Sequence, residues 1–278
     1  MALNGKTAVV TGAALGIGRA ITEILVKNGA KVALLDVNEA EAKTLKKALD
    51  KQYGQENTLF VKCDVESEEQ IKAALQTTAD TFGGIDIVCN NAGILNEGEW
   101  EKTVSINLLG VIRVTYLVLK HMNKLSGGRG GVVVNTASMA GLGPFLTCPA
   151  YSATKHGVVG FTRSMALASI VSDYGIRFNA VCPGFVQTDL MDNIPNNLGQ
   201  FSHLADIEKE MVEKMGTIQN RNVIEVYPPS HWTTEVIALV WIVGNIWFDE
   251  LRATENMNIQ LWLSEESFLL HHCEEEQH

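Results

Sequence analysis

Short hydrophobic runs rich in β-branched residues recur along most of this chain. Six of them have the length and composition of strands, at 7–11, 31–36, 58–64, 85–90, 130–138 and 176–184. Amphipathic stretches of about 12 to 20 residues separate them, with apolar positions at helical spacing. This alternation predicts a parallel sheet with helices on both faces. Right-handed crossovers then give an α/β, doubly wound (Rossmann) fold, which we place in a single domain, residues 1–219.

Composition narrows the class of protein. The chain has 278 residues and a net charge of −10, which disfavours nucleic acid as a partner because phosphate binding needs a basic face. Its five cysteines show no CxxC spacing, which is typical of free thiols in a reducing compartment. We find no secretion signal and no run of about 18 apolar residues. The sequence therefore predicts a soluble cytoplasmic protein without a membrane span. We expect no metal site, and we interpret His271, His272 and Cys273 as part of a solvated tail.

A glycine-rich turn, TGAALGIG at 11–18, joins the first strand to the first helix. Gly12 permits a tight turn, while Gly16 and Gly18 let the backbone approach a phosphate beside the helix N-terminus. A purely structural turn is the alternative, but the strand before it and the helix after it favour a dinucleotide site. The predicted cofactor contacts in this loop are Gly12, Ala13, Ala14, Leu15, Gly16, Ile17 and Gly18.

Acidic and amide residues follow three other predicted strands. Asp36 ends the second strand, where a carboxylate accepts hydrogen bonds from ribose hydroxyls and repels a 2′-phosphate. The next residue is Val37 and not an arginine, so NAD is favoured over NADP. The third strand ends at Cys63, Asp64 and Val65, which we assign to the adenine edge. Asn91, in the NNAG of 90–93, either holds backbone at the cofactor or makes a turn.

Two Tyr-x-x-x-Lys patterns compete for a catalytic role. Residues four apart share a helix face, so Tyr151–Lys155 and Tyr116–Lys120 both qualify by spacing. Tyr116 lies far along an apolar helix, and we interpret it as core or interface packing. Tyr151 opens its helix and follows Ser138, a hydroxyl at the end of the fifth strand. Open α/β sheets bind ligands at that edge.

Taken together, these motifs resemble the short-chain dehydrogenase/reductase family over roughly residues 5–190. The resemblance rests on TGAALGIG, Asp36, NNAG, Asn107, Ser138, Tyr151, Lys155 and the Pro183–Gly184 pair. It implies an NAD cofactor and a catalytic tetrad of Asn107, Ser138, Tyr151 and Lys155. Tyr151 would be the base, with a pKa lowered by the nearby ammonium and nicotinamide. Lys155 would also reach the ribose, and Asn107 would hold a water. Contacts to the nicotinamide amide and phosphates would come from Val186, Gln187 and Thr188.

Longer stretches, such as NNAGILNEGEWEKTVSINL and YSATKHGVVGFTRSMALA, are similar to one NAD-dependent, lipid-oxidising branch of the family. That similarity implies oxidation of the 15-hydroxyl of prostaglandins and related hydroxylated fatty acids. A steroid or a hydroxyacyl substrate is the alternative. Segments 139–150 and 185–216 would flank the substrate, which Ser138, Cys148 and Tyr151 would contact. Their apolar wall would comprise Met139, Leu142, Phe145, Leu146, Phe185, Leu190, Met191 and Ile194. The family also implies a homodimer that pairs the helices at 103–124 and 150–172.

The resemblance stops at the final segment, 220–278, which we treat as an atypical tail. The family continues with a helix and a seventh strand, whereas this segment matches neither pattern. We hypothesise an alternative or mispredicted exon. A catalytically impaired isoform, which binds NAD or pairs with an intact subunit, is therefore a third interpretation.

Overall fold

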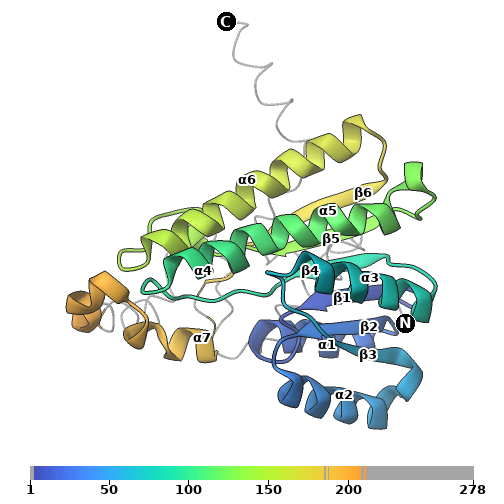
Figure 1. Cartoon of the computed structure of the whole chain (residues 1–278), viewed down its shortest axis with the longest axis horizontal. Helices are drawn as coiled ribbons and strands as arrows, with labels where there is room; N and C mark the ends of the chain where they lie inside the picture. The colour runs from blue at the N-terminus through green and yellow to red at the C-terminus, as the bar shows by residue number, and fades with distance from the viewer. Residues whose placement is uncertain (1–2, 185, 187, 208–209, 211–278) are drawn as a thin grey trace, which may run out of the picture.

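The computed structural model describes residues 3–184, 186, 188–207 and 210 (Figure 1). The predictions made for residues 220–278, Phe185 and Gln187 lie outside this part of the chain, and so does the side chain of Met191.

A single parallel sheet forms the centre of the fold. Its strands run in the order β3-β2-β1-β4-β5-β6, and the order reverses between β1 and β4. Ligands of open α/β sheets bind at such a reversal, outside the carboxyl ends of the strands. The predicted doubly wound fold is thus confirmed. The strands are β1 (Thr7–Thr11), β2 (Lys31–Asp36), β3 (Thr58–Lys62), β4 (Ile87–Asn90), β5 (Gly131–Thr136) and β6 (Ile176–Val181).

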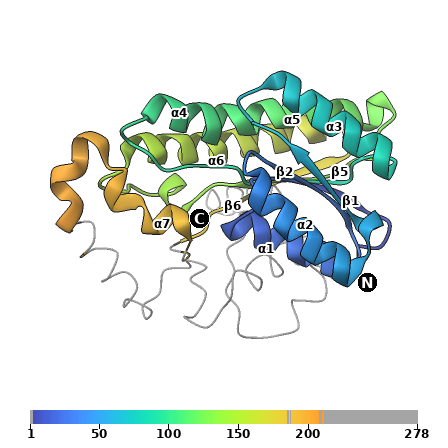
Figure 2. The same cartoon turned by 60° about the horizontal axis from the view of Figure 1, so that its bottom comes forward.

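Helices cover both faces of the sheet (Figure 2). Because strand side chains alternate between faces, Ala8 and Val10 pack with α1 and α2, whereas Val9 packs with α3, α5 and α6. The sheet thus has a separate hydrophobic core on each face. The helices are α1 (Gly16–Lys27), α2 (Glu39–Tyr53), α3 (Glu68–Phe82), α4 (Trp100–Val104), α5 (Val111–Met122), α6 (Pro149–Val171) and α7 (Asp189–Asp192).

Several strands end before the predicted residue. The fifth strand stops at Thr136, because Ser138 starts a 3₁₀ turn (Met139–Gly141) and its Oγ accepts the Ala140 N–H at 3.1 Å. Ser138 therefore stands just beyond the sheet, in the loop layer where ligands bind.

The segment Trp100–Met122 is an almost continuous helix, interrupted by a π-helical turn at Ser105–Gly110. By its length of 23 residues and its apolar composition alone this segment could cross a membrane, which the sequence analysis did not predict. However, Val114, Val118 and Met122 pack into the core against the sheet. We therefore treat this segment as a core helix of the α/β layer.

Candidate active site

The glycine loop after β1 is packed too tightly for side chains. Gly12 has φ +62°, and a Cβ there would lie 2.8 Å from the Cα of Ala92. A Cβ on Gly18 would lie 1.9 Å from the carbonyl oxygen of Gly12. At the start of α1 the N-cap residue, Leu15, provides no side-chain hydrogen bond. The first N–H groups of α1 thus remain available to an anion, which fits the pyrophosphate of a dinucleotide.

Asp36, at the end of β2, is tied to this loop. Its Oδ2 accepts the Ala14 N–H at 2.8 Å, and its Oδ1 accepts the Asn38 N–H at 2.8 Å. A carboxylate has about four acceptor sites, so it can bind ribose hydroxyls as well. The neighbouring Val37 is 58% exposed. The structure thus binds Asp36 to the backbone of the glycine loop and leaves the next residue, Val37, exposed.

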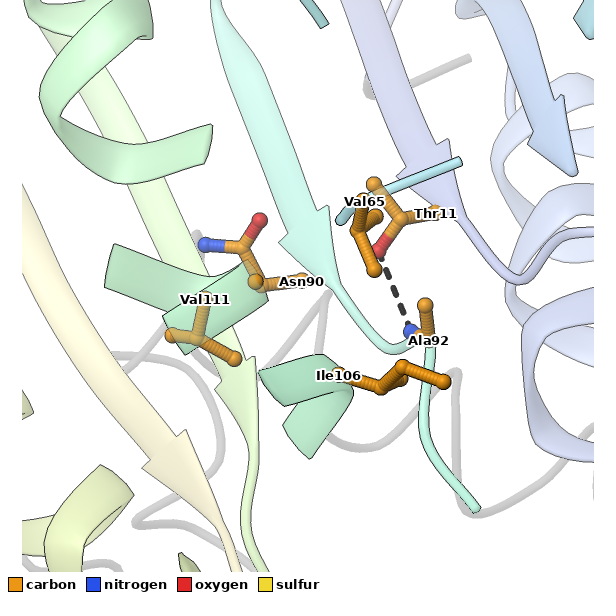
Figure 3. A pocket seen from close by; sticks show the side chains of 7 residues that line it. Thr11, Val65, Asn90, Ala92, Ile106 and Val111 are labelled. Atoms are coloured by element: carbon orange, nitrogen blue, oxygen red, sulfur yellow. Dashed lines mark hydrogen bonds between the residues drawn. The ribbon is translucent and has the colours of Figure 1, made fainter. Parts of the chain in front are cut away.

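Thr11 and Asn91 hold β1 and β4 together at the same edge. Thr11 Oγ1 accepts the N–H groups of Asn91 and Ala92 at 3.0 and 3.1 Å. Asn91 Nδ2 donates to the carbonyls of Thr11 and Gly12 at 3.3 and 3.2 Å. Figure 3 shows Thr11 beside Ala92, with Val65 and Ile106 around a small hollow. Asn91 therefore supports the glycine loop. Thr11 supports it as well, and the sequence analysis did not predict this role.

The remaining predicted cofactor contacts differ in their distance from the glycine loop and in their burial. Val65 lines the hollow beside Thr11, and its carbonyl accepts a hydrogen bond from Arg113 Nη1 at 3.3 Å. Cys63 is buried, and burial raises the pKa of its thiol to about 11. Asp64 accepts the Glu66 N–H in the turn that follows β3. Thr188 lies at the glycine loop, because a Cβ on Gly16 would be 3.2 Å from its methyl group, and Val186 is half-buried.

The predicted catalytic side chains meet where β5 ends and α6 begins. Tyr151 and Lys155 are both buried, and Lys155 Nζ lies 5.5 Å from the centre of the Tyr151 ring. Lys155 Nζ also donates to the carbonyl of Thr136 at 2.8 Å. Ser138 lies near enough to Tyr151 for its side chain to lower the pKa of the tyrosine. The competing Tyr116 is 54% exposed on α5 and packs edge to face on Phe161, at 5.7 Å between ring centres.

The electrostatics of this cluster are dominated by burial. Burial raises the pKa of Tyr151 to about 12, Ser138 opposes this rise, and Cys148 adds to it. Burial also lowers the pKa of Lys155 to about 8. The lowering that we predict needs both Lys155 and the nicotinamide, and it stays a prediction. In the chain by itself, burial has the largest effect on the pKa of Tyr151, because the ring is almost wholly removed from water.

Asn107 lies in the π-helical turn and is fully buried. Its Oδ1 accepts the Ile94 N–H, and its Nδ2 donates to the Ile94 carbonyl, both at 2.8 Å. Nδ2 also donates to Thr154 Oγ1 at 3.4 Å. Both amide hydrogens are therefore committed, so a water at this point would have to meet backbone groups or Oδ1.

An apolar cluster packs around Tyr151. Cys148 is fully buried in it, beside Thr147, and three predicted wall residues, Phe145, Leu190 and Ile194, pack there. Two other predicted wall residues, Leu142 and Leu146, are instead 43% and 53% exposed. The buried part of this wall also includes Leu95 and Leu198, which the sequence analysis did not predict.

Glu97 is a further residue at this site that sequence reasoning missed. It is 1% exposed, and its carboxylate accepts the N–H groups of Ala150 and Tyr151 at 3.2 and 2.9 Å. In the sequence it belongs to the acidic stretch NEGEW, which is typical of a solvated surface. In the described part of the chain, no cluster of three or more His, Cys, Asp or Glu residues is placed to hold a metal ion.

The comparisons with known proteins agree with this architecture. The chain is 48% identical over 220 residues to 15-hydroxyprostaglandin dehydrogenase [NAD(+)] of Homo sapiens, covering 78% of this chain and 83% of that protein. It is 36% identical over 197 residues to 3beta-hydroxysteroid dehydrogenase 2 of Eggerthella lenta, covering 68% and 74% respectively. The fold matches a crystal structure of a short chain dehydrogenase/reductase from Burkholderia phymatum in complex with NAD. That match has a TM-score of 0.73 and 22% identity, and covers 88% of this chain and 87% of the other. Since the short chain dehydrogenase model also matches residues 6–199, the chain belongs to the short-chain dehydrogenase/reductase family.

Proposed function

We propose that this chain is an NAD-dependent dehydrogenase that oxidises a secondary alcohol to a ketone. The substrate we favour is the 15-hydroxyl of prostaglandins and related hydroxylated fatty acids. The observation that carries the proposal is the convergence of Ser138, Tyr151 and Lys155 at the end of β5, next to a tightly packed glycine loop.

Each residue has a step that its position supports. Tyr151 accepts the proton of the substrate hydroxyl, and Ser138 binds the same oxygen and orients it. Lys155, held by the Thr136 carbonyl, keeps positive charge beside the ring and within reach of a ribose. When bound, NAD would supply the hydride acceptor, and the positive charge of its nicotinamide would favour the phenolate. Asn107 fixes the backbone at Ile94, which lies beside this cluster.

Cofactor choice follows from the glycine loop and Asp36. The loop and the open N-terminus of α1 suit a pyrophosphate, and the Asp36 carboxylate suits a free ribose 2′-hydroxyl. The human relative is named for NAD(+), which supports the same choice. The other residues that the sequence predicts to contact the cofactor are part of the same proposed NAD site.

The apolar cluster around Tyr151 supports a lipid-like substrate. Its walls come from Leu95, Phe145, Cys148, Ile194 and Leu198. The similarity to the human dehydrogenase favours a 15-hydroxyprostaglandin. A sterol is the second candidate, because the relative from Eggerthella lenta is named for a 3β-hydroxysteroid and an apolar wall suits a steroid equally well.

The decisive experiment follows NADH appearance when the purified chain meets NAD and a 15-hydroxylated prostaglandin, with a 3β-hydroxysteroid in parallel. Tyr151→Phe should lose at least about 10²-fold in kcat because it removes the proton acceptor. Tyr116→Phe is the matched control, since it alters the other Tyr-x-x-x-Lys pattern, and it should keep full activity.

The outcomes separate the candidate functions. Turnover of the steroid alone would replace the prostaglandin proposal with the second candidate. A chain that binds NADH but turns over neither alcohol would be an impaired isoform. Full activity in Tyr151→Phe would contradict the proposed base.

We further propose that the protein is cytoplasmic. We also propose that two copies of the chain pair through α5 and α6. These helices lie side by side in both views (Figures 1 and 2), and together they expose Tyr116, Leu167, Ile170 and Val171. Ile170→Asp would place a charge in this face and should convert a dimer to a monomer, as measured by sedimentation. A monomeric parent protein would contradict the pairing.

A further inference from the structure

The start of α6, the helix that carries Tyr151, lacks an ordinary cap. The first turn of a helix leaves N–H groups without intrahelical partners, and a Ser, Thr, Asp or Asn at the N-cap usually binds one of them. Here the N-cap residue is Cys148, whose side chain makes no capping hydrogen bond. Pro149 has no N–H, so Ala150 and Tyr151 carry the donors that need a partner.

Glu97 supplies that cap from a loop more than fifty residues away in sequence. Its two carboxylate oxygens each accept one of these N–H groups, Oε1 from Tyr151 and Oε2 from Ala150. The side chain is buried, and no salt bridge reaches it from any described residue. A buried negative charge is costly unless it is compensated, and here the two N–H groups and the positive end of α6 compensate it.

The loop that contains Glu97 also contacts residues 197–199, a segment next to the apolar cluster around Tyr151. The Glu97 N–H donates to the carbonyl of Asn197 at 2.8 Å. A Cβ on Gly199, which has φ +53°, would lie 2.6 Å from the backbone nitrogen of Gly98 and 2.7 Å from the carbonyl carbon of Glu97. Asn197 and Gly199 flank Leu198, which packs in the cluster around Tyr151. Glu97 thus contacts both the helix that carries Tyr151 and the segment that brings Leu198 into the cluster around it.

We propose that Glu97 is a positioning residue for the reaction: its carboxylate sets where Tyr151 stands relative to Ser138 and the apolar wall. The inference rests on the proposed dehydrogenase function. Glu97 reaches the first residues of α6 and not the glycine loop, so its loss should affect turnover and spare cofactor binding. A misplacement of about 1 Å at a reacting group can cost about 10²-fold in rate.

The test compares Glu97→Ala, Glu97→Gln and the control Glu101→Gln, which removes an exposed carboxylate just after the same acidic stretch. We expect Glu97→Ala to lower kcat by about 10- to 100-fold while NADH binding stays unchanged. Glu97→Gln should recover part of this loss because its amide oxygen still accepts one N–H. Glu101→Gln should match the parent. Hydrogen exchange should become faster at Ala150 and Tyr151 in Glu97→Ala, and stay unchanged in α1.

Two results would overturn the inference. One is an unchanged kcat in Glu97→Ala, and the other is a loss of activity, NADH binding and melting temperature in parallel, which describes a general structural residue. Any secondary alcohol that the parent oxidises serves for the kinetic arm. If the parent oxidises none, the proposed function fails on its own, and unchanged exchange at Ala150 and Tyr151 would still overturn the cap.

Discussion

The glycine loop and the start of α6 both form parts of the candidate site, but they are built in different ways. The turn of the loop comes from a short motif, in which Gly12 and Gly18 contact each other, and Asn91 supports it from the end of β4, 79 positions away from Gly12. The start of α6 depends on partners far away in sequence, since Glu97 binds Ala150 and Tyr151, and Lys155 reaches the end of β5. A short motif can therefore identify the first region, whereas the geometry of the second requires the fold.

The two regions also differ in electrostatics. The N-terminus of α1 stays open, with Leu15 40% exposed, so the partial positive charge there can meet a ligand. Around Tyr151 and Lys155 burial sets the pKa of both groups, raising the first and lowering the second. The difference implies that changes in α6 should show in stability against pH, and changes in the loop should show in cofactor binding.

The largest effect we expect comes from Lys155. Its pKa falls from 10.5 in an unfolded chain to about 8 in the folded protein, because burial disfavours the ammonium. Below the folded value Lys155 is protonated in both states. Between the two values the unfolded chain binds the proton and the folded protein does not, so this group's contribution to stability rises with pH.

Lys155→Met should remove that rise. Relative to this variant, the parent should gain about 2 kcal/mol in free energy of unfolding when the pH rises from about 7.5 to about 9.5. Urea unfolding at both pH values measures the difference, with the exposed Lys47→Met as control. The comparison matters because buried thiols oppose the rise: the pKa of Cys89 is raised by burial to about 12, so its contribution falls above pH 9. Parallel pH curves for the parent and Lys155→Met would contradict the burial effect.

A methyl group in the glycine loop should have the next largest effect. Gly18→Ala forces a Cβ against the carbonyl of Gly12, a contact that the backbone must move to relieve, at a cost of about 1–3 kcal/mol. We expect NADH affinity to fall by about 10- to 100-fold, as measured by fluorescence titration. Gly83→Ala, at a positive φ with no neighbour within 4 Å, should reduce stability but keep NADH affinity. Equal affinity in Gly18→Ala and the parent would break the comparison between the two regions.

The smallest effect should come from Asp36→Asn. The amide can still accept one of the two N–H groups that Asp36 binds, but it no longer repels a 2′-phosphate. The ratio of kcat/KM for NAD over NADP should fall by about 10-fold, or about 1.4 kcal/mol. Stability should change little. An unchanged ratio would mean that Asp36 serves the loop backbone and not cofactor choice.

Much of the fold could be predicted because its signals are local. The first two strands begin and end at the predicted residues, and α6 differs from the prediction by one residue at each end. Ser138, Tyr151 and Lys155 could be singled out because a strand end and a helix start place them at one edge of the sheet. Thr11 carried no such signal, since its partners, the N–H groups of Asn91 and Ala92, meet it only when β1 and β4 pair.

The sequence by itself determined the sheet, the glycine loop and the choice between two Tyr-x-x-x-Lys patterns. Hydrophobic periodicity and turn residues act over a few positions, so they can be recognised from the sequence alone. The tertiary structure decided that burial raises the pKa of Tyr151, and that Glu97 caps α6. Both depend on groups that meet only after folding, because burial and long-range hydrogen bonds are properties of the packed chain.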